Sequence, residues 1–82
     1  MKTDLITIAD DYEIKINLKK VLIKNNINRN QLSLLTGIKL DTINRYYFEK
    51  LDRVDLNILK LFCLALNCKI SDLLILEKID KS

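Results

Sequence analysis

The 82-residue chain contains no proline, no histidine and no tryptophan, and it has a single glycine. Many-turned β folds need glycine and proline at their turns, so this composition argues against a loop-rich or β-rich architecture. The absence of histidine removes the commonest general acid or base. The sequence also shows neither a glycine-rich phosphate loop nor paired carboxylates suited to catalysis. We therefore expect a protein that is not an enzyme and that needs no cofactor.

Cysteine is also scarce, and its spacing matches no metal site. Cys63 and Cys68 lie five residues apart, and two thiolates without further ligands cannot complete a tetrahedral zinc site. We interpret both residues as small, buried apolar side chains in a reducing compartment.

Long apolar runs are missing as well. No segment approaches the ~20 apolar residues that a membrane-spanning helix needs. The N-terminal segment MKTDLITIADDYE lacks the apolar core of a secretion signal. We expect a cytoplasmic protein with no membrane partner. No small-molecule ligand is expected either, because the sequence shows no second, sensory domain.

The charges are distributed unevenly along the chain. The formal net charge is +3, but residues 1–14 carry −3, whereas residues 15–76 hold eleven Lys or Arg against five Asp or Glu and carry +6. A basic segment of this kind is compatible with binding a polyanion. Surface lysines are also ordinary solubilising groups, so charge alone leaves both interpretations open.

Apolar and polar residues alternate in the N-terminal segment LITIADDYEIKI (5–16), where Ile6 and Ile8, and then Tyr12, Ile14 and Ile16, recur at every second position. This period is typical of half-buried strands. We expect a short β-strand or hairpin that forms an N-terminal arm over residues 1–15. An isolated hairpin is marginal in water, so the arm should lie on the helical body or on a partner subunit.

From residue 17 onward the apolar residues recur at helical spacing, and their 49% share of the chain suffices for one small domain. Asn17, Asn28 and Asp55 are suited to cap helix N-termini, and Gly37 and Asn67 to end helices in a left-handed conformation. The five helices expected are NLKKVLIKNN (17–26), INRNQLSLLTG (27–37), KLDTINRYYFEK (39–50), DLNILKLFCLALN (55–67) and ISDLLIL (70–76). The residues expected to face inward are Leu18, Val21, Leu22, Leu32, Leu35, Ile43, Tyr46, Tyr47, Leu56, Leu59, Phe62, Cys63, Leu66, Ile70, Leu73 and Leu74.

The single glycine lies between the second and third of these helices, in LLTGIKLDTINRYY (34–47). Gly37 can adopt a left-handed conformation without a Cβ penalty, which predicts a helix, a forced turn and a second helix. Ser33 is small enough to lie where the two helices cross. Such a helix-turn-helix presents its second helix as a ridge that fits the major groove of DNA. An ordinary helical hairpin inside a bundle fits the same pattern.

From Ile16 to Leu74 the chain resembles the phage-repressor (Cro-like, XRE-type) helix-turn-helix family. The resemblance rests on INLKKVL (16–22), RNQLSLLTGIKLDTINR (29–45) and VDLNILKLFCLALNCKISDLL (54–74). It implies an all-α fold, a compact five-helix bundle of the lambda-repressor type over residues 16–76, with a tail over residues 77–82. It also implies sequence-specific binding of double-stranded operator DNA by a small transcriptional regulator, usually a repressor, that acts as a homodimer.

The resemblance also implies which residues meet DNA. Asn44 could pair with adenine, Arg45 with guanine or a phosphate, and Leu40 with a thymine methyl group. Arg29 lies near the N-terminus of the preceding helix, where exposed amides and side chains meet phosphate. The expected base-contacting residues are Lys39, Leu40, Asp41, Thr42, Asn44 and Arg45, and the expected phosphate-contacting residues are Arg29, Gln31, Lys50 and Arg53.

The sequence departs from the family pattern at several positions. Lys39 and Lys69 stand where a Ser or Thr cap is usual. Asp41 either accepts a hydrogen bond from cytosine or caps the first turn of its helix. The exit segment YYFEK (46–50) replaces a polar, glycine-containing one, so that Tyr46 would enter the core while Tyr47 and Phe48 cover the junction. A tyrosine hydroxyl on a phosphate is the alternative.

Leucine is also in surplus at positions that the family leaves polar. Leu34, Leu61 and Leu64, joined by Ile23, could form a subunit interface, and the N-terminal arm is another candidate for dimerisation. Scattered surface leucines are also common and need no role. The competing functional hypothesis is an antitoxin or a protein-interaction module that keeps the helix-turn-helix fold with little DNA recognition.

Overall fold

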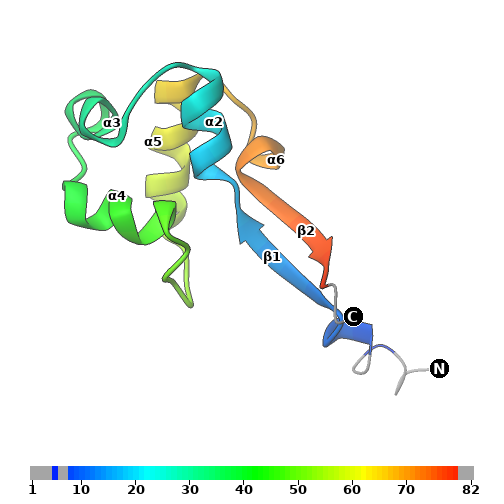
Figure 1. Cartoon of the computed structure of the whole chain (residues 1–82). Helices are drawn as coiled ribbons and strands as arrows, with labels where there is room; N and C mark the ends of the chain where they lie inside the picture. The colour runs from blue at the N-terminus through cyan, green and yellow to red at the C-terminus, as the bar shows by residue number, and fades with distance from the viewer. Residues whose placement is uncertain (1–4, 6–7, 80–82) are drawn as a thin grey trace.

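The computed structural model describes residue 5 and residues 8–79, and Figure 1 shows a helical body from which a two-stranded arm projects. All five expected helices are present. The elements are β1 (Tyr12–Ile16), α2 (Leu18–Lys24), α3 (Arg29–Thr36), α4 (Leu40–Tyr47), α5 (Leu56–Leu66), α6 (Ile70–Leu73) and β2 (Leu74–Lys78).

The core lies between the helices of this body. Phe62 on α5 is fully buried, and its ring meets that of Tyr46 on α4 edge-on, with 5.4 Å between centroids. The Tyr46 hydroxyl accepts a hydrogen bond of 2.9 Å from the backbone N–H of Asp55, so its polar end is satisfied at the start of α5. The predicted core role of Tyr46 is therefore confirmed. The buried apolar residues are Leu18, Val21, Leu22, Leu32, Ile43, Tyr46, Leu59, Phe62, Leu66 and Leu73.

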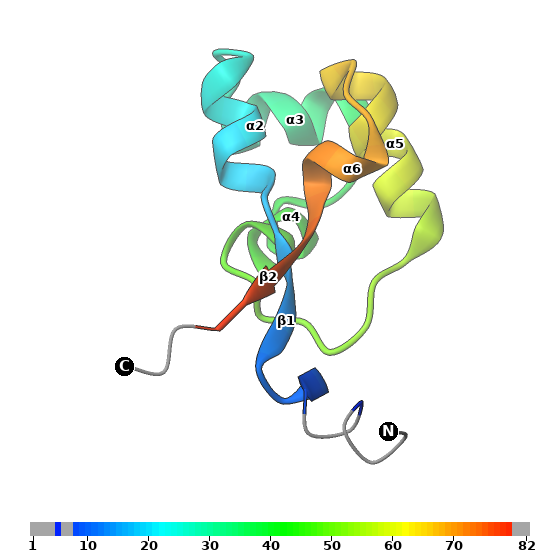
Figure 2. The ribbon, with the colours of Figure 1, turned by 90° about the vertical axis from the view of Figure 1, so that its right-hand side faces the viewer.

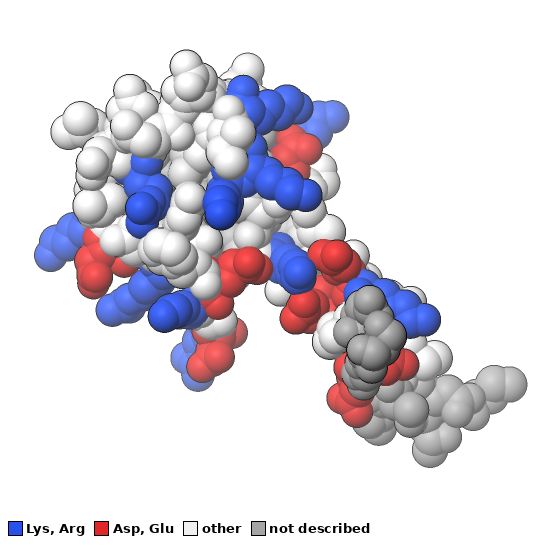
Figure 3. Space-filling model, viewed as in Figure 1, with Lys and Arg blue, Asp and Glu red and all other residues white. Residues whose placement is uncertain are grey.

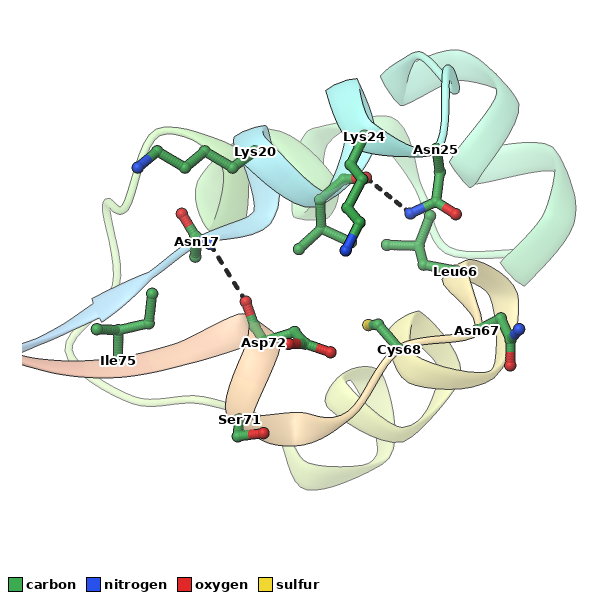
Figure 4. Close-up of a pocket in the computed structure, with 11 residues that line it drawn as sticks. Asn17, Lys20, Lys24, Asn25, Leu66, Asn67, Cys68, Ser71, Asp72 and Ile75 are labelled. Atoms are coloured by element: carbon green, nitrogen blue, oxygen red, sulfur yellow. Dashed lines mark hydrogen bonds between the residues drawn. The ribbon is translucent and has the colours of Figure 1, made fainter.

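Two of the three expected N-caps are formed as predicted. Asn28 and Gln31 form a reciprocal capping box, in which each side chain accepts a hydrogen bond from the other residue's backbone N–H. The Asp55 carboxylate accepts from two backbone N–H groups in the first turn of α5. Asn17 occupies the N-cap position of α2 but makes no cap bond, because its side-chain amide donates instead to the backbone oxygen of Asp72 (Figure 4).

Four helices, α2 to α5, are followed within two residues by a left-handed residue, whereas α6 continues directly into the extended β2. Gly37 ends α3 at φ +74°, and Asn67 ends α5 at φ +49°, which confirms both predictions. Asn26 after α2 and Glu49 after α4 adopt the same conformation, at φ +55° and +56°. Asparagine tolerates this region well, whereas glutamate does so at a cost of about 1 kcal/mol.

The arm consists of β1 and β2, so the fold is not purely α-helical. The strands pair antiparallel with Tyr12 opposite Lys78 and Ile16 opposite Leu74. Backbone hydrogen bonds from Ile79 to Asp11 and from Asn17 to Leu73 extend the pairing at both ends. The expected N-terminal strand is present, and its partner comes from the C-terminal part of the chain. Figure 2 shows the two strands leaving the helices together as a twisted ribbon.

The projecting arm makes the molecule elongated. Its extents are 47 × 23 × 21 Å and its radius of gyration is 14.7 Å. A compact domain of this length would have a radius of gyration of about 12 Å. Only the base of the arm, at Ile16 and Leu74, packs against the core of the helical body.

The structure corrects the expectation for the last helix and for three inward-facing residues. The segment 70–76 was expected to be helical throughout, but α6 ends at Leu73 and the chain continues as β2. Leu35, Leu56 and Ile70 are exposed, because the short helices bury only one narrow stripe each. At the other end, Ile8 is helical and not part of a strand, and Ile6 lies outside the described residues.

The two cysteines are half-buried and not joined to one another. Burial, with the nearby Cys63 as the next cause, raises the pKa of Cys68 to about 11, so its thiol stays protonated at neutral pH. Within the part of the chain that the structure describes, no helix is both long and apolar enough to cross a membrane.

Candidate nucleic-acid interface

The turn between α3 and α4 is held by side-chain hydrogen bonds to its own backbone. The Ser33 hydroxyl donates to the backbone oxygen of Ile38 at 2.6 Å. Thr36 accepts from the Ile38 N–H at 3.2 Å and donates to the Leu32 oxygen at 2.7 Å. Gly37 is the left-handed residue between them. The turn is therefore a defined structure that sets how α4 crosses α3.

The helix α4 has one buried and one open face. Ile43 and Tyr46 are buried in the core and hold the helix against the body. On the other side, Leu40, Asp41 and Arg45 are exposed to solvent. Of the remaining predicted base-contacting residues, Lys39 is exposed, whereas Thr42 and Asn44 are half-buried. The predicted exposed ridge is thus present at this end of the molecule (Figure 1).

Arg29 connects the start of α3 with the middle of α4. Its Nη1 donates a hydrogen bond of 2.6 Å to Oδ1 of Asn44. Its guanidinium carbon lies 4.4 Å from the ring centroid of Tyr47 and 5.1 Å from that of Phe48, so the cation stacks on two aromatic rings. The Asn44 amide is thereby oriented with its oxygen toward Arg29. Sequence analysis placed these two residues in separate groups of contacts, and the fold brings them together.

Asp41 and Arg45 form a weak ion pair one helical turn apart. The Arg45 Nη2 lies 3.9 Å from an oxygen of Asp41, and both side chains are largely exposed. Exposed pairs of this kind contribute little to stability, so Arg45 remains free to exchange this partner for another. Asp41 lies in the first turn of α4, but no side chain caps that helix and Lys39 occupies the N-cap position.

The end of α4 is tied to the base of the arm. The backbone N–H groups of Glu49 and Lys50 bond to Tyr46 and Arg45, which closes the helix around the left-handed Glu49. The Glu49 carboxylate accepts a hydrogen bond of 3.0 Å from the backbone N–H of Ile16. Nothing in the sequence pattern pointed to this contact, because its partners lie 33 residues apart.

The predicted phosphate-contacting residues lie around the same end of the body. Lys50 and Arg53 are exposed in the loop after α4, and Gln31 is exposed on α3 while its side-chain oxygen serves the capping box. Figure 3 shows Lys and Arg side chains, with acidic ones between them, over α4 and this loop, whereas the surface over α3 is nearly free of charge. The basic groups therefore surround the exposed face of α4.

A shallow hollow joins the two predicted groups of residues. It is lined by Asn28, Arg29, Asn30, Leu40 and Asn44. Asn28 and Asn30 were not among the predicted site residues, although their place in the first turn of α3, beside Arg29, could have indicated them. A second hollow between α2, the end of α5 and α6 contains none of the predicted residues (Figure 4).

A family model of the Cro/C1-type HTH DNA-binding domain matches residues 17–78. The chain belongs to this family. The match confirms the resemblance stated from the sequence and makes the chain a helix-turn-helix DNA-binding domain. It also covers β2, so the match extends to Lys78, the last residue of the second strand of the arm.

The fold also occurs among solved structures. A crystal structure described as the transcriptional regulator VanUg, Form II, is 23% identical in sequence to this Cro/C1-type domain. The match covers 83% of this chain and 89% of that chain, with a TM-score of 0.65, which shows a shared fold. No curated protein matches the sequence.

Proposed function

We propose that this Cro/C1-type domain is a sequence-specific regulator of transcription, a repressor, that binds operator DNA as a homodimer with α4 in the major groove. The observation that carries the proposal is the open face of α4. Ile43 and Tyr46 anchor the helix from behind, while Leu40 and Arg45 face solvent. A ridge of this kind, one helix wide and flanked by cations, is what the major groove accommodates.

The proposed base contacts lie along this ridge. Arg45 would bond to the O6 and N7 of guanine, and Leu40 would meet a thymine methyl group. Asn44 has its amide nitrogen directed away from Arg29 and available to a base acceptor, and its oxygen keeps a second lone pair for a donor. Asp41 would accept from a cytosine amino group after releasing Arg45. Lys39 and Thr42 complete the proposed set of base-contacting residues.

The proposed phosphate contacts flank the ridge on both sides. Arg29 and Gln31 lie at the start of α3, and Lys50 and Arg53 follow α4. Each cation that neutralises a phosphate adds about −0.9 to the slope of log affinity against log salt concentration. The domain should therefore be retained on random duplex DNA at low salt and be released steeply as salt is raised.

Arg45→Ala tests the proposed recognition face. We expect the variant to lose about 1–3 kcal/mol of specific binding, because a good bidentate base contact has this value. The circular dichroism signal should be unchanged, since the Arg45 side chain is exposed. Fluorescence anisotropy with operator fragments, selected from the source genome by binding, measures the loss. A palindrome among these fragments and its half-site spacing would test the homodimer.

Lys24→Ala is the matched control for this experiment. It removes one positive charge from the end of α2, beside the hollow that contains none of the predicted site residues (Figure 4). We expect operator affinity close to wild type. Equal losses in Lys24→Ala and Arg45→Ala would mean that net charge alone drives binding, and wild-type affinity in Arg45→Ala would refute the assignment of the recognition face.

A protein-interaction module or antitoxin is the second candidate, and one observation favours it. Leu34 is 85% exposed on the uncharged outer surface of α3, with Leu35 exposed beside it in sequence. An apolar, uncharged helix face is a common feature of protein interfaces. The salt dependence of retention on duplex DNA separates the two candidates, because a module without DNA recognition would show neither retention nor a slope.

A further inference from the structure

The two-stranded arm has two chemically different faces. Side chains directly opposite one another in an antiparallel pair lie on the same face. Ile14 and Leu76 are such a pair, and Ile16 and Leu74 are another, so these four residues share one apolar face. On the other face, the Lys15 Nζ lies 3.8 Å from Glu13 and 3.7 Å from Glu77. That second face is ionic at its outer part, and the half-buried Ile75 lies opposite Lys15 toward the body.

The outer part of the apolar face is open to solvent in the single chain. Ile14 is 63% exposed and Leu76 is 66% exposed, although they form the centre of the ribbon. The face continues beyond the strand into an apolar groove at the tip of the arm. The groove is lined by Leu5, Ile8, Ala9, Tyr12, Glu13, Ile14 and Leu76.

An isolated two-stranded ribbon is only marginally stable in water, and it normally needs a further layer over its apolar face. The helical body covers only the base of this face, where Ile16 and Leu74 pack against the core, because the rest of the arm projects from the body (Figures 1 and 2). DNA is a poor candidate for the cover. Residues 8–16 and 74–79 hold four acidic and two basic side chains, a net charge of −2. A cover for this face should itself be apolar.

The area of the face fits a second copy. The exposed apolar side chains of the face and its groove are Leu5, Ile8, Tyr12, Ile14 and Leu76, with exposures from 39% to 70%. They would bury about 350 Å² of apolar surface per copy, taking ~120 Å² for each fully exposed side chain. Two copies would bury about 700 Å² of apolar surface. Interfaces are about 60% apolar, so the total would be about 1,200 Å². This value reaches the lower end of specific protein–protein interfaces and predicts a dimer of modest affinity.

We propose that two copies of this chain stack the apolar faces of their arms on one another in a two-fold, antiparallel arrangement. The charges favour this direction. The arm has a net charge of −2, with Asp10, Asp11 and Glu13 near its tip against Lys78 opposite Tyr12, whereas Lys19 and Lys20 begin α2 at its base. Antiparallel stacking brings the acidic tip of one arm to the basic base of the other, and parallel stacking would bring two acidic tips together.

This proposal names the surface through which the homodimer proposed above would form. It rests on the proposed function only for the binding of two DNA half-sites by one dimer. Sedimentation velocity of the full chain across the micromolar range tests it. We expect a reversible dimer in the wild type. Ile14→Lys should weaken it by at least about tenfold, since burying a lysine in place of an isoleucine forfeits more than 1.4 kcal/mol. Leu34→Lys and Leu64→Lys place the same charge on exposed leucines of α3 and α5 and should leave the dimer intact.

A wild type that stays monomeric, or a dimer that survives Ile14→Lys and dissociates in Leu34→Lys or Leu64→Lys, would overturn the proposed surface. Added salt should weaken the dimer, and a dimer strengthened by salt would refute the antiparallel direction. Retention of monomeric Ile14→Lys on random duplex DNA is measured in parallel. If the wild type dimerises through the arm but shows no DNA retention, the proposed function fails and the proposed interface stands.

Discussion

Arg29 offers the sharpest test of how the fold prepares the proposed recognition helix. The fold gives this arginine two separable tasks, a positive charge near the expected phosphate and a hydrogen bond that orients Asn44. Arg29→Lys keeps the charge, but a lysine cannot both stack on Tyr47 and Phe48 and donate to Asn44 in the same geometry. Arg29→Gln removes the charge as well. The two variants therefore separate orientation from phosphate attraction.

The expected magnitudes follow from the contacts. Loss of a correctly oriented Asn44 should cost up to about 1–3 kcal/mol of specific binding. We expect Arg29→Lys to lose most of this amount on operator DNA while retaining wild-type affinity for random duplex. Arg29→Gln should in addition reduce the salt slope by about 0.9. Fluorescence anisotropy at several salt concentrations, with both DNA probes, measures all of these quantities.

A double-mutant cycle with Asn44→Ala decides between the two tasks. If Arg29 acts through Asn44, Arg29→Lys should cause little further loss in the Asn44→Ala background, because the coupled partner is already gone. Additive losses would show that the two residues act independently. Arg29→Lys with wild-type operator affinity would refute the orienting role altogether.

Two further predictions concern the turns on either side of α4. Gly37→Ala should destabilise the domain by about 1–2 kcal/mol, which lowers Tm by about 4–8 °C per kcal/mol, whereas Gly37→Asn should cost less. No atom lies within 4 Å of the added Cβ, so the loss should come from the backbone at φ +74°, and an unchanged Tm would contradict this account. Glu49→Gly should leave Tm nearly unchanged. Glycine removes the conformational strain of a glutamate at positive φ, and this gain offsets the loss of the hydrogen bond to Ile16. Hydrogen exchange of the Ile16 amide should nevertheless become faster than in Glu49→Gln, and equal protection in both variants would show that the carboxylate does not hold the arm.

The helices and their ends were predictable because the signals that set them are local. Asn28 and Asp55 cap helices through N–H groups two or three residues away. Gly37 and Asn67 were recognisable because few residue types adopt positive φ. The same argument missed Glu49, since glutamate carries no such preference. Its side chain accepts a hydrogen bond from a residue 33 positions earlier, a contact that no local pattern indicates.

The last segment shows where local signals fail. ISDLLIL fits a helical stripe and a buried strand equally well, because short apolar runs have no clear period. Pairing with β1 decides the outcome, and the change from α6 to β2 occurs where Leu74 meets Ile16. The exposure of Arg45 and Leu40 on α4 was predictable from their place after the turn. The contact between Arg29 and Asn44 was not, because residue spacing does not determine which side chains meet across two crossing helices.

The amino-acid sequence by itself determined the five helices, the sharp turn at Gly37 and the family to which the chain belongs, because these depend on neighbours within a few positions. The tertiary structure alone decided that residues 12–16 and 74–78 pair in one arm. It also decided that Arg29 orients Asn44 and that Glu49 ties α4 to the arm. These contacts bring together residues far apart in sequence, and their energies exist only once the chain has folded.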